Sequence, residues 1–355
     1  MPTVAKLLRL ALVGAAAGLL LNGKPTEACT RAVYQGPEDR VLTGRTMDWK
    51  FEWDGNLWIF PRGMERSGLA GPRSVTWTSQ YGSVIVTGYD LGTVDGLNEA
   101  GLMANALWLT DAQYPEDDGV TPRLSLSLWP QFMLDSFATV AEAVDYLRAN
   151  PIHVVTADLP DQPGRLTTIH VSISDATGDS AIFQWVGGEQ QIYHSREYQV
   201  VTNEPTFREQ LAMNQYWSRV NRLMFMPGTS RSEDRFARAS FLINAVEQVN
   251  DTRLAAAAVF SVMRNVSAPF GVSVDDSPNL STTRWRVVAD QKELLYYFES
   301  VVSPSIFWVD LNNVDFSPEA GVRKLDLGPR QQNLFSGDVA NKFVAAEPFQ
   351  FMPVD

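Results

Sequence analysis

The chain of 355 residues contains one cysteine, and its position predicts nucleophilic chemistry. Cys29 follows Thr26-Glu27-Ala28, a small-residue cleavage site preceded by the positive residues Lys6 and Arg9 and an apolar stretch at 10–21. Removal of residues 1–28 as a secretory signal peptide would place a thiol and an α-amine on the same residue. Since an α-amine has a pKa of roughly 7.7–8.0, it can accept the thiol proton near neutral pH. We therefore expect an exported protein, periplasmic or secreted, whose first residue supplies both nucleophile and base.

Three other interpretations of Cys29 have to be weighed. In a lipoprotein Cys29 would be acylated, but such signals usually place Leu three residues earlier, where this chain has Thr26. Free cysteines are often buried core residues, although a position at a cleavage junction argues against that. The number of residues between Cys29 and both His170 and Asn203 fits a papain-like enzyme, yet the sequence around Cys29 does not match that family. His170 itself lies in an alternating run typical of a half-buried strand.

Composition excludes several classes of function. Without residues 1–28 the chain keeps 327 residues, enough for one domain spanning 29–355, and its net charge changes from −12 to −14. This charge disfavours nucleic acid and anionic membranes as partners. No second long apolar run follows, so we expect no stable membrane anchor. The three histidines show no metal-ligand spacing, and we expect neither a metal site nor a cofactor.

A charged pair is predicted to return close to Cys29. Segments 30–35 and 40–46 resemble strands and flank the turn-forming residues Gly36-Pro37-Glu38-Asp39, which predicts a hairpin. Arg45 and Asp48 end its second strand. At that place Arg45 would lower the pKa of the thiol and Asp48 would hold the α-amine. An ordinary surface ion pair at the end of a hairpin fits the same spacing equally well.

The remaining pattern alternates blocks of strands with blocks of helices. Because strands do not alternate singly with helices, antiparallel sheets are favoured, with helices stacked outside two facing sheets. Thr139 and Glu142 form a capping-box signature, and Asn250 or Asp251 is the expected N-cap of a later helix. Residues 96–101 are expected to form a turn that leads into a strand at 102–107. Further strands are expected at 57–60, 83–87, 166–174, 180–185, 191–194, 198–202, 283–290, 293–299 and 305–310, and helices within 125–150 and at 207–217, 235–249 and 252–264.

Five motifs in order resemble the choloylglycine hydrolase and penicillin V acylase family, whose members are N-terminal nucleophile hydrolases. The motifs are Cys29-Thr30, Gly44-Arg45-x-Met47-Asp48, Asn98-Glu99-x-Gly101-Leu102, Val201-Thr202-Asn203-x-Pro205-Thr206-Phe207 and Arg235-Phe236. The resemblance implies an α+β fold, the four-layer αββα sandwich, and an enzyme that forms homotetramers. It implies that Cys29 is the nucleophile, with Arg45 and Asp48 beside it. It also implies that Asn203 donates to the oxyanion and that Arg235 is the second arginine of the site.

One position departs from the family pattern. By the resemblance, Trp108 stands where bile-salt hydrolases carry an Asn whose backbone N–H serves the oxyanion, so this donor can survive the change of side chain while the pocket cannot stay the same. Together with Trp49, Trp108 would favour flat aromatic or long acyl groups, although both could be core residues. This is similar to the exported Gram-negative branch, which includes penicillin V acylases and N-acyl-homoserine lactone acylases. We therefore expect hydrolysis of a linear N-acyl amide through a thioester. Alternatives are a bile-salt hydrolase, a ceramidase-like amidase, or a lipid-anchored protein that binds an apolar ligand.

Overall fold

The computed structural model describes residues 29–354, except 53, 161, 221–222 and 273–280. The predicted signal peptide at 1–28 lies outside the described residues. Two large sheets form the centre of the molecule, and their strands are almost all antiparallel to their neighbours. Among the described helices, none is long and apolar enough to cross a membrane.

The first sheet has seven strands and begins with the predicted hairpin. Its order is β16-β1-β2-β17-β18-β19-β21, so the first two strands of the described chain lie beside strands from its middle and its end. The strands are β16 (Val200–Thr202), β1 (Thr30–Gln35), β2 (Val41–Trp49), β17 (Thr282–Asp290), β18 (Leu295–Ser300), β19 (Phe307–Asp310) and β21 (Gly337–Asp338).

The second sheet has nine strands in the order β15-β14-β13-β8-β7-β6-β3-β20-β22. Small two-stranded pairings flank it. Its strands are β15 (Glu189–His194), β14 (Ser180–Val186), β13 (Ile169–Ser174), β8 (Met103–Trp108), β7 (Gly92–Asn98), β6 (Ser83–Gly88), β3 (Leu57–Phe60), β20 (Arg323–Leu325) and β22 (Val344–Ala345). The flanking strands are β4 (Glu65–Ser67), β5 (Thr76–Thr78), β9 (Arg123–Ser125), β10 (His153–Val155), β11 (Asp158–Leu159) and β12 (Gln162–Leu166).

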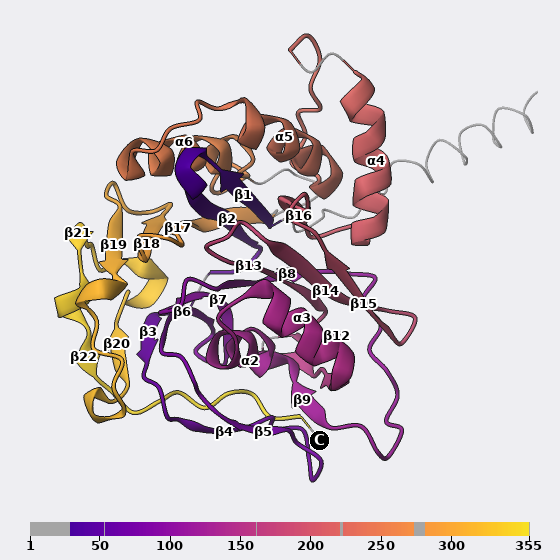
Figure 1. Cartoon of the computed structure of the whole chain (residues 1–355), viewed down its shortest axis with the longest axis vertical. Coiled ribbons are helices and arrows are strands. Elements are labelled where there is room, and N and C mark those ends of the chain that lie inside the picture. The colour runs from indigo at the N-terminus through magenta and orange to yellow at the C-terminus, as the bar shows by residue number, and fades with distance from the viewer. Residues whose placement is uncertain (1–28, 53, 161, 221–222, 273–280, 355) are drawn as a thin grey trace, which may run out of the picture.

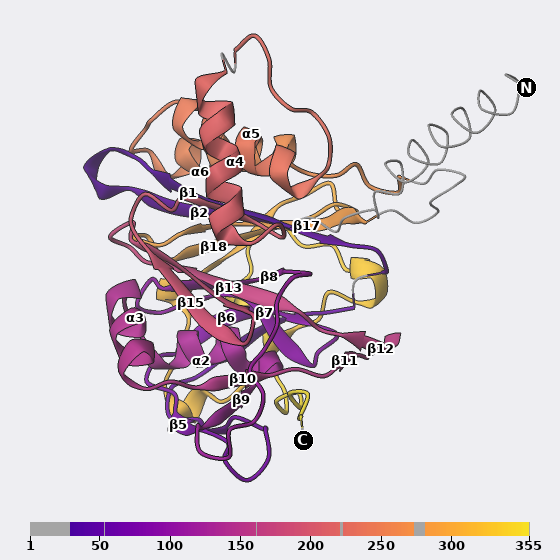
Figure 2. The same cartoon turned by 90° about the vertical axis from the view of Figure 1, so that its right-hand side faces the viewer.

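Helices cover the outer face of each sheet, as Figures 1 and 2 show. The capping box of Thr139 and Glu142 begins α3, and Asp251 caps α6, as predicted. On the nine-stranded sheet lie α2 (Trp129–Ser136) and α3 (Val140–Ala149), and over the seven-stranded sheet lie α5 (Ser232–Ala245) and α6 (Thr252–Asn265), with α4 (Phe207–Arg219) beside α5. The four-layer αββα sandwich predicted from the sequence is therefore confirmed.

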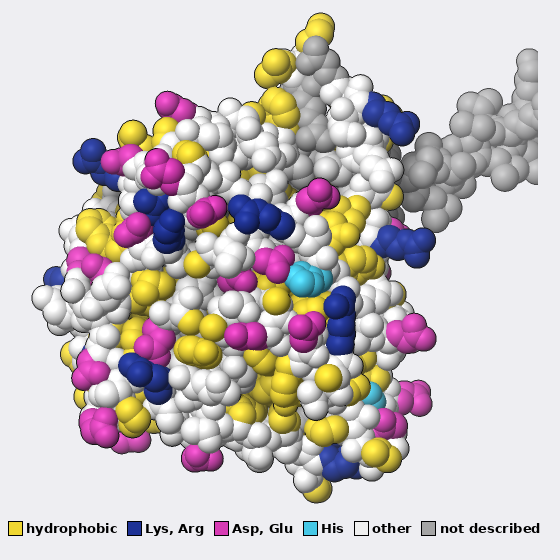
Figure 3. All heavy atoms as spheres, viewed as in Figure 1, with side chains coloured by type: hydrophobic (Ala, Val, Ile, Leu, Met, Phe, Trp, Pro, Cys, Tyr) yellow, Lys and Arg dark blue, Asp and Glu magenta, His cyan; other side chains and the backbone are white. Residues whose placement is uncertain are grey.

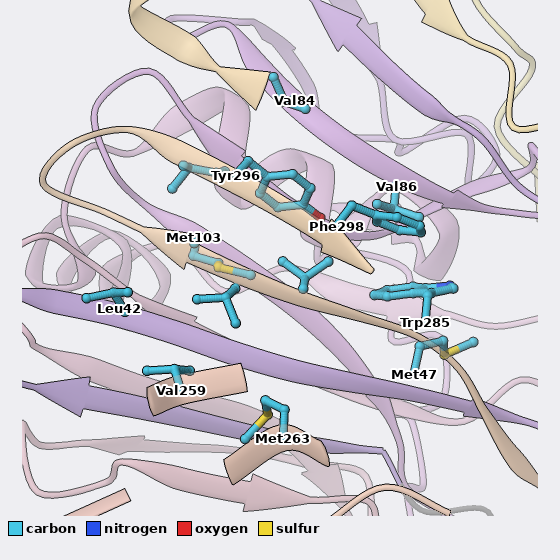
Figure 4. Close-up of a cluster of buried hydrophobic side chains, with 14 of the residues drawn as sticks. Leu42, Met47, Val84, Val86, Met103, Val259, Met263, Trp285, Tyr296 and Phe298 are labelled. Atoms are coloured by element: carbon cyan, nitrogen blue, oxygen red, sulfur yellow. The ribbon is translucent and has the colours of Figure 1, made fainter. Parts of the chain in front are cut away.

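The core between the two sheets is made of large apolar side chains from both (Figure 4). Val84 and Met103 of the nine-stranded sheet face Trp285 and Phe298 of the seven-stranded one, and all four are fully buried. Burial of apolar surface is the main favourable contribution to stability in such a core.

Strand β2 divides its side chains between two layers. Gly44 faces α6, since a Cβ there would lie 2.6 Å from the Cγ1 atom of Val259. Successive residues of a strand point to opposite faces, so Arg45, Met47 and Trp49 face the inside of the sandwich while Asp48 faces the helices. This alternation decides which partners each site residue meets.

The sequence prediction missed β7, because Gly92–Asn98 form a strand in the middle of the nine-stranded sheet. The turn predicted at 96–101 is confirmed only after Asn98, where the N–H of Gly101 donates to the carbonyl of Asn98 over 3.0 Å. Gly96 is required there because a Cβ would lie 2.8 Å from side-chain atoms of Ile85 and Leu134. The short strands β20 and β22 were also missed, and α5 ends at Ala245 rather than at 249.

Candidate active site

Cys29 lies where the two edges of β1 bring distant residues together. Thr30 pairs with Thr46 of β2 on one side and with Thr202 of β16 on the other, so Met47 and Asn203 flank Cys29. The Cys29 side chain is 4 % exposed. Its Sγ atom lies 3.7 Å from the sulfur of Met47 and accepts a hydrogen bond of 3.5 Å from the backbone N–H of Asp48.

Arg45 crosses from β2 to the nine-stranded sheet and places its guanidinium beside the thiol. Its Nη2 atom lies 4.0 Å from the Sγ atom of Cys29 and donates to the carbonyl of Ala106. Its Nη1 atom donates to the carbonyl of Val94 (2.9 Å) and to the carboxylate of Asp95 (3.2 Å). The guanidinium is thus held by several acceptors and is 1 % exposed, so it is not the surface ion pair that the spacing alone also allowed.

Burial dominates the titration of the thiol. It raises the pKa of Cys29 above its ordinary value, while the positive charge of Arg45 acts in the opposite direction and Asp48 adds to the rise. The predicted effect of Arg45, a lowering of the thiol pKa, is therefore present, but burial outweighs it. A buried neutral thiol needs a base to remove its proton before it can act as a nucleophile.

The carboxylate of Asp48 is bound by a helix and by a neighbouring strand. It accepts hydrogen bonds from Arg235 of α5 and from the hydroxyl of Thr283 on β17. Both members of the Asp48–Arg235 ion pair are buried. The Asp48 side chain lies on the helix face of β2, where it meets α5. In this unprocessed chain the Cys29 nitrogen belongs to a peptide bond, so the expectation that Asp48 holds the α-amine stays a prediction for the processed protein.

Asn203 contacts the nitrogen of Cys29. That nitrogen donates to the Oδ1 atom of Asn203 over 3.0 Å, and the Asn203 side chain is fully buried. The contact follows from the register of β1 and β16, which brings the residue after Thr202 beside the residue before Thr30. Because the oxygen of the Asn203 amide faces the Cys29 nitrogen, the two N–H groups of this amide point away from that nitrogen.

A pocket with a volume of about 120 Å³ opens beside Cys29. Five of the seven predicted site residues line it. The other two contact lining residues, Asn203 the nitrogen of Cys29 and Arg235 the carboxylate of Asp48. Its described lining contains no histidine, so the papain-like interpretation of His170 finds no support there. The lining comprises Cys29, Arg45, Met47, Asp48, Trp49, Gly88, Tyr89, Leu91, Gly92, Thr93, Val94, Ala106, Trp108, Leu126, Ser127, Leu159, Pro160, Thr167, Ile169 and Met352.

The two tryptophans lie together in this lining. Their ring centroids are 5.9 Å apart at an interplanar angle of 52°. Trp49 belongs to the core and also faces the pocket, and its indole N–H donates to the hydroxyl of Tyr89 over 2.7 Å. The guanidinium of Arg165 lies 4.7 Å from the centre of the Trp108 ring. Opposite Trp108 in the sheet, Ile169 gives its backbone N–H to the hydroxyl of Tyr114.

Sequence reasoning missed two residues that hold the site. Asp95 accepts from Arg45, from the amide of Asn105 (2.7 Å) and from the hydroxyl of Tyr296 (2.6 Å), which joins the two sheets at one buried carboxylate. Burial raises the pKa of Asp95, and Arg45 opposes the rise. Tyr89, which orients Trp49, was also missed. Neither residue lies in a predicted motif, since Asp95 meets Arg45 and Tyr296, and Tyr89 meets Trp49, across long separations in sequence.

Among the described residues no three His, Cys, Asp or Glu side chains gather in a way that could hold a metal ion. The described site offers a thiol, two guanidinium groups, an amide and backbone donors. The thiol can attack a carbonyl carbon, and the N–H donors can stabilise the anion that results.

Comparison with known proteins gives concordant matches. The family described as linear amide C-N hydrolases, choloylglycine hydrolase family, matches residues 29–322. The chain is 45% identical over 355 residues to a penicillin V acylase of Pectobacterium atrosepticum, with 94% of each chain covered. Its structure is similar to that of penicillin V acylase from Agrobacterium tumefaciens, with a TM-score of 0.85, 52% identity and coverage of 92% and 100% of the two chains. A mutant conjugated bile acid hydrolase from Clostridium perfringens shares the fold at 20% identity, with a TM-score of 0.71 and coverage of 86% and 98%.

Proposed function

Because the chain belongs to the choloylglycine hydrolase family of linear amide C–N hydrolases, we propose that it cleaves N-acyl amides whose acyl group is aromatic or long. Penicillin V and N-acyl-homoserine lactones are the substrates we propose to test first. The observation that carries this proposal is the position of Cys29, whose thiol lines an apolar pocket walled by two tryptophans while its nitrogen is bound by Asn203. The penicillin V acylase relatives support the choice of substrate.

The proposed reaction begins with the α-amine of a processed Cys29. This amine takes the thiol proton, and the thiolate attacks the amide carbonyl carbon. The resulting oxyanion is stabilised by donors from the side chain of Asn203 and the backbone N–H of Trp108. The protonated amine then gives its proton to the leaving nitrogen as the C–N bond breaks, which leaves a thioester on Cys29. Water, deprotonated by the same amine, releases the acid and restores the thiol.

The charged residues are proposed to favour the ionised thiol and to hold the backbone beside it, and not to transfer protons. Arg45 lies 4.0 Å from the thiol sulfur and favours its ionised form against burial. The Asp48–Arg235 pair fixes the end of β2, and through it the backbone N–H of Asp48 that donates to Cys29. Asn203 positions the nitrogen that serves as base.

The acyl group is proposed to enter the apolar part of the pocket. Trp49 and Trp108 offer two large ring faces to a flat group, and Leu159 and Ile169 extend the apolar surface. Aromatic rings of this kind gain stability from stacking as well as from burial. A phenoxyacetyl group or a straight alkyl chain fits this chemistry better than a polar acyl group.

The test is a comparison of penicillin V, an N-acyl-homoserine lactone and a glycine-conjugated bile salt as substrates of the mature protein. We expect release of amine from the first two and slow or no release from the bile salt. Cys29→Ala should abolish turnover while the variant stays folded, and Cys29→Ser should be far slower because the hydroxyl is a weaker nucleophile. A Cys29→Ala variant with normal activity would refute the proposal, and so would a mature wild-type protein that hydrolyses none of the three amides.

Removal of residues 1–28 during export is part of the same proposal, because the α-amine exists only after cleavage. We also propose that residues 29–355 act as one domain and that the protein assembles as a homo-oligomer, a tetramer by resemblance to its family. Support for assembly comes from exposed apolar residues in the last turns of α4 and just beyond it. Leu223 is 86% and Met224 84% exposed, and Tyr216 of α4 and Phe225 are also exposed. Figure 3 shows apolar side chains at this end of the molecule. Such surfaces commonly mark protein interfaces.

Assembly can be tested by light scattering coupled to size-exclusion chromatography. We expect a mass of several chains for the wild type and a smaller mass for a Leu223→Glu/Met224→Glu double variant. A wild-type protein that elutes as a monomer at micromolar concentration would refute this part of the proposal.

A further inference from the structure

The last residues of the described chain form part of the pocket. Met352 lines the same cavity as Cys29, although 323 residues separate the two in sequence. The family match ends at residue 322, so this contribution to the pocket lies outside the matched region. Residues 349–354 are called the C-terminal strap here, and Figure 2 shows the chain ending beneath the nine-stranded sheet.

The backbone of the strap is anchored on both sides of Met352. The Met352 N–H donates to the carbonyl of Leu91 over 2.9 Å. Its carbonyl accepts from the hydroxyls of Ser125 (2.7 Å) and Ser127 (2.9 Å). The next but one residue, Val354, donates its N–H to the carbonyl of Leu69 over 2.8 Å. These three bonds to the N–H and the carbonyl of Met352 fix the direction in which its side chain leaves the backbone.

Aromatic packing fixes the strap from its other side. The rings of Phe349 and Phe351 lie 4.5 Å apart, centre to centre, and Phe349 also packs edge-on against Trp58 of β3 at 5.3 Å. Phe351 lies 6.3 Å from the ring of Phe60, and the guanidinium of Arg66 lies over both Phe60 and Phe351. The strap is therefore an integral part of the outer layer and not a loose tail.

Met352 and Cys29 approach the pocket from opposite layers. Cys29 precedes β1 in the seven-stranded sheet, whereas Met352 is bound to Leu91 beside β7 and to Ser127 in the short 3-10 helix η2 (Leu126–Leu128), which packs on the nine-stranded sheet. Because both residues line the same pocket, an acyl chain that is attached at Cys29 and fills this pocket would approach Met352.

We propose that Met352 is a specificity-determining residue that limits the length of the acyl group. This inference rests on the proposed function, because it assigns the pocket to the acyl side of the substrate. Methionine suits such a position, since its unbranched thioether fills irregular space and adapts to ligands of different length. The chemical class recognised at this end of the pocket is a terminal alkyl or aryl group, which gains by burial against Met352 and Leu91.

Substitution of Met352 tests the proposal with two changes of opposite sign. Met352→Ala lengthens the pocket and should raise the ratio of kcat/KM for dodecanoyl- over hexanoyl-homoserine lactone by about tenfold or more, because one methylene in an apolar pocket changes discrimination by about tenfold or more. Met352→Trp shortens the pocket and should lower the same ratio by a similar factor. Met64→Ala, a partly buried methionine that does not line the pocket, is the matched control and should leave the ratio unchanged.

A second measurement separates this proposal from the hydrolase proposal. Calorimetric titration of hexanoate and dodecanoate into the same variants reports acyl binding without turnover, and thermal unfolding shows which variants fold. If Met352→Trp does not fold, Met352→Val replaces it as a second test. Valine is shorter than methionine, so this variant should raise the dodecanoyl-to-hexanoyl ratio, as Met352→Ala does. If the Met352 variants change the relative affinity for hexanoate and dodecanoate but no protein turns over an amide, the proposed function is refuted and the role of Met352 in acyl binding is supported. Equal chain-length preference in all folded variants, by turnover and by binding, would overturn the role of Met352.

Discussion

Replacement of Asn203 tests the proposed chemistry because its side-chain amide has two separable parts. Its oxygen accepts from the Cys29 nitrogen over 3.0 Å, and its nitrogen is the proposed donor to the oxyanion. Asn203→Asp keeps an acceptor of the same size and removes the donor. Asn203→Ala removes both. Since the side chain is fully buried, water does not readily replace either function.

The expected magnitude follows from the loss of one donor in a buried site. Removing an oxyanion-hole donor typically lowers kcat about 10²–10³-fold, equivalent to about 2.7–4 kcal/mol. Asn203→Asp should lose at least that much although it retains the acceptor, because its negative charge also repels the oxyanion. Asn203→Ala should lose a similar factor and, in addition, the hydrogen bond that orients the nitrogen of Cys29, worth about 0.5–1.5 kcal/mol.

The assay is release of primary amine from penicillin V at saturating substrate, with unfolding in urea measured in parallel. Asn98→Asp is the matched control. The Asn98 amide is also fully buried and donates to the carbonyls of Leu134 and Phe137, but it does not line the pocket. This variant should be less stable, by about 1–3 kcal/mol for each donor lost, and should keep the wild-type kcat. An Asn203→Asp variant that turns over within a few-fold of wild type would refute the donor role of Asn203.

Three further predictions concern titration and packing. Because burial raises the pKa of Cys29, its alkylation by iodoacetamide should keep accelerating above about pH 8.5, and a plateau near neutrality would contradict this. Burial lowers the pKa of His170 to about 4 from 6.5, so the unfolded chain binds a proton that the folded chain does not, and stability should fall by about 3 kcal/mol as pH drops from 6.5 to 4. A His170→Gln variant should lack this loss in urea unfolding curves, and an unchanged pH dependence would rule His170 out as its source. Gly44→Ala should cost about 1–3 kcal/mol, because its Cβ would lie 2.6 Å from Val259, and an unchanged melting temperature would refute the close approach.

Local sequence signals predicted the part of the fold that local interactions decide. The turn cluster at 36–39 fixed the bounds of β1, and the capping box fixed the start of α3. The failure at β7 has the opposite cause. Gly92, Gly96 and Asp95 are typical of a turn, yet Gly96 admits two neighbouring side chains and Asp95 is satisfied by Arg45 and Tyr296 from the other sheet. Partners so distant in sequence leave no periodic pattern.

The candidate site shows the same division. The hairpin predicted that Arg45 and Asp48 return to Cys29, and the structure places them there. The hairpin did not predict that Asp48 pairs with Arg235. This pairing depends on which layer the Asp48 carboxylate faces and on the packing of α5, which carries Arg235. Met352 could not be predicted at all. Its place in the pocket depends on hydrogen bonds to Leu91 and to two serines far away in the sequence.

The central claim is that a processed Cys29 carries the acyl group during turnover. The most direct measurement is peptide mapping by mass spectrometry of the exported protein after acid quenching during hydrolysis of penicillin V. Our account predicts a mature chain that begins at Cys29 and an N-terminal peptide that carries a phenoxyacetyl thioester on that residue. A chain that begins elsewhere, a lipid on Cys29, or an acyl group on a different residue would contradict the account.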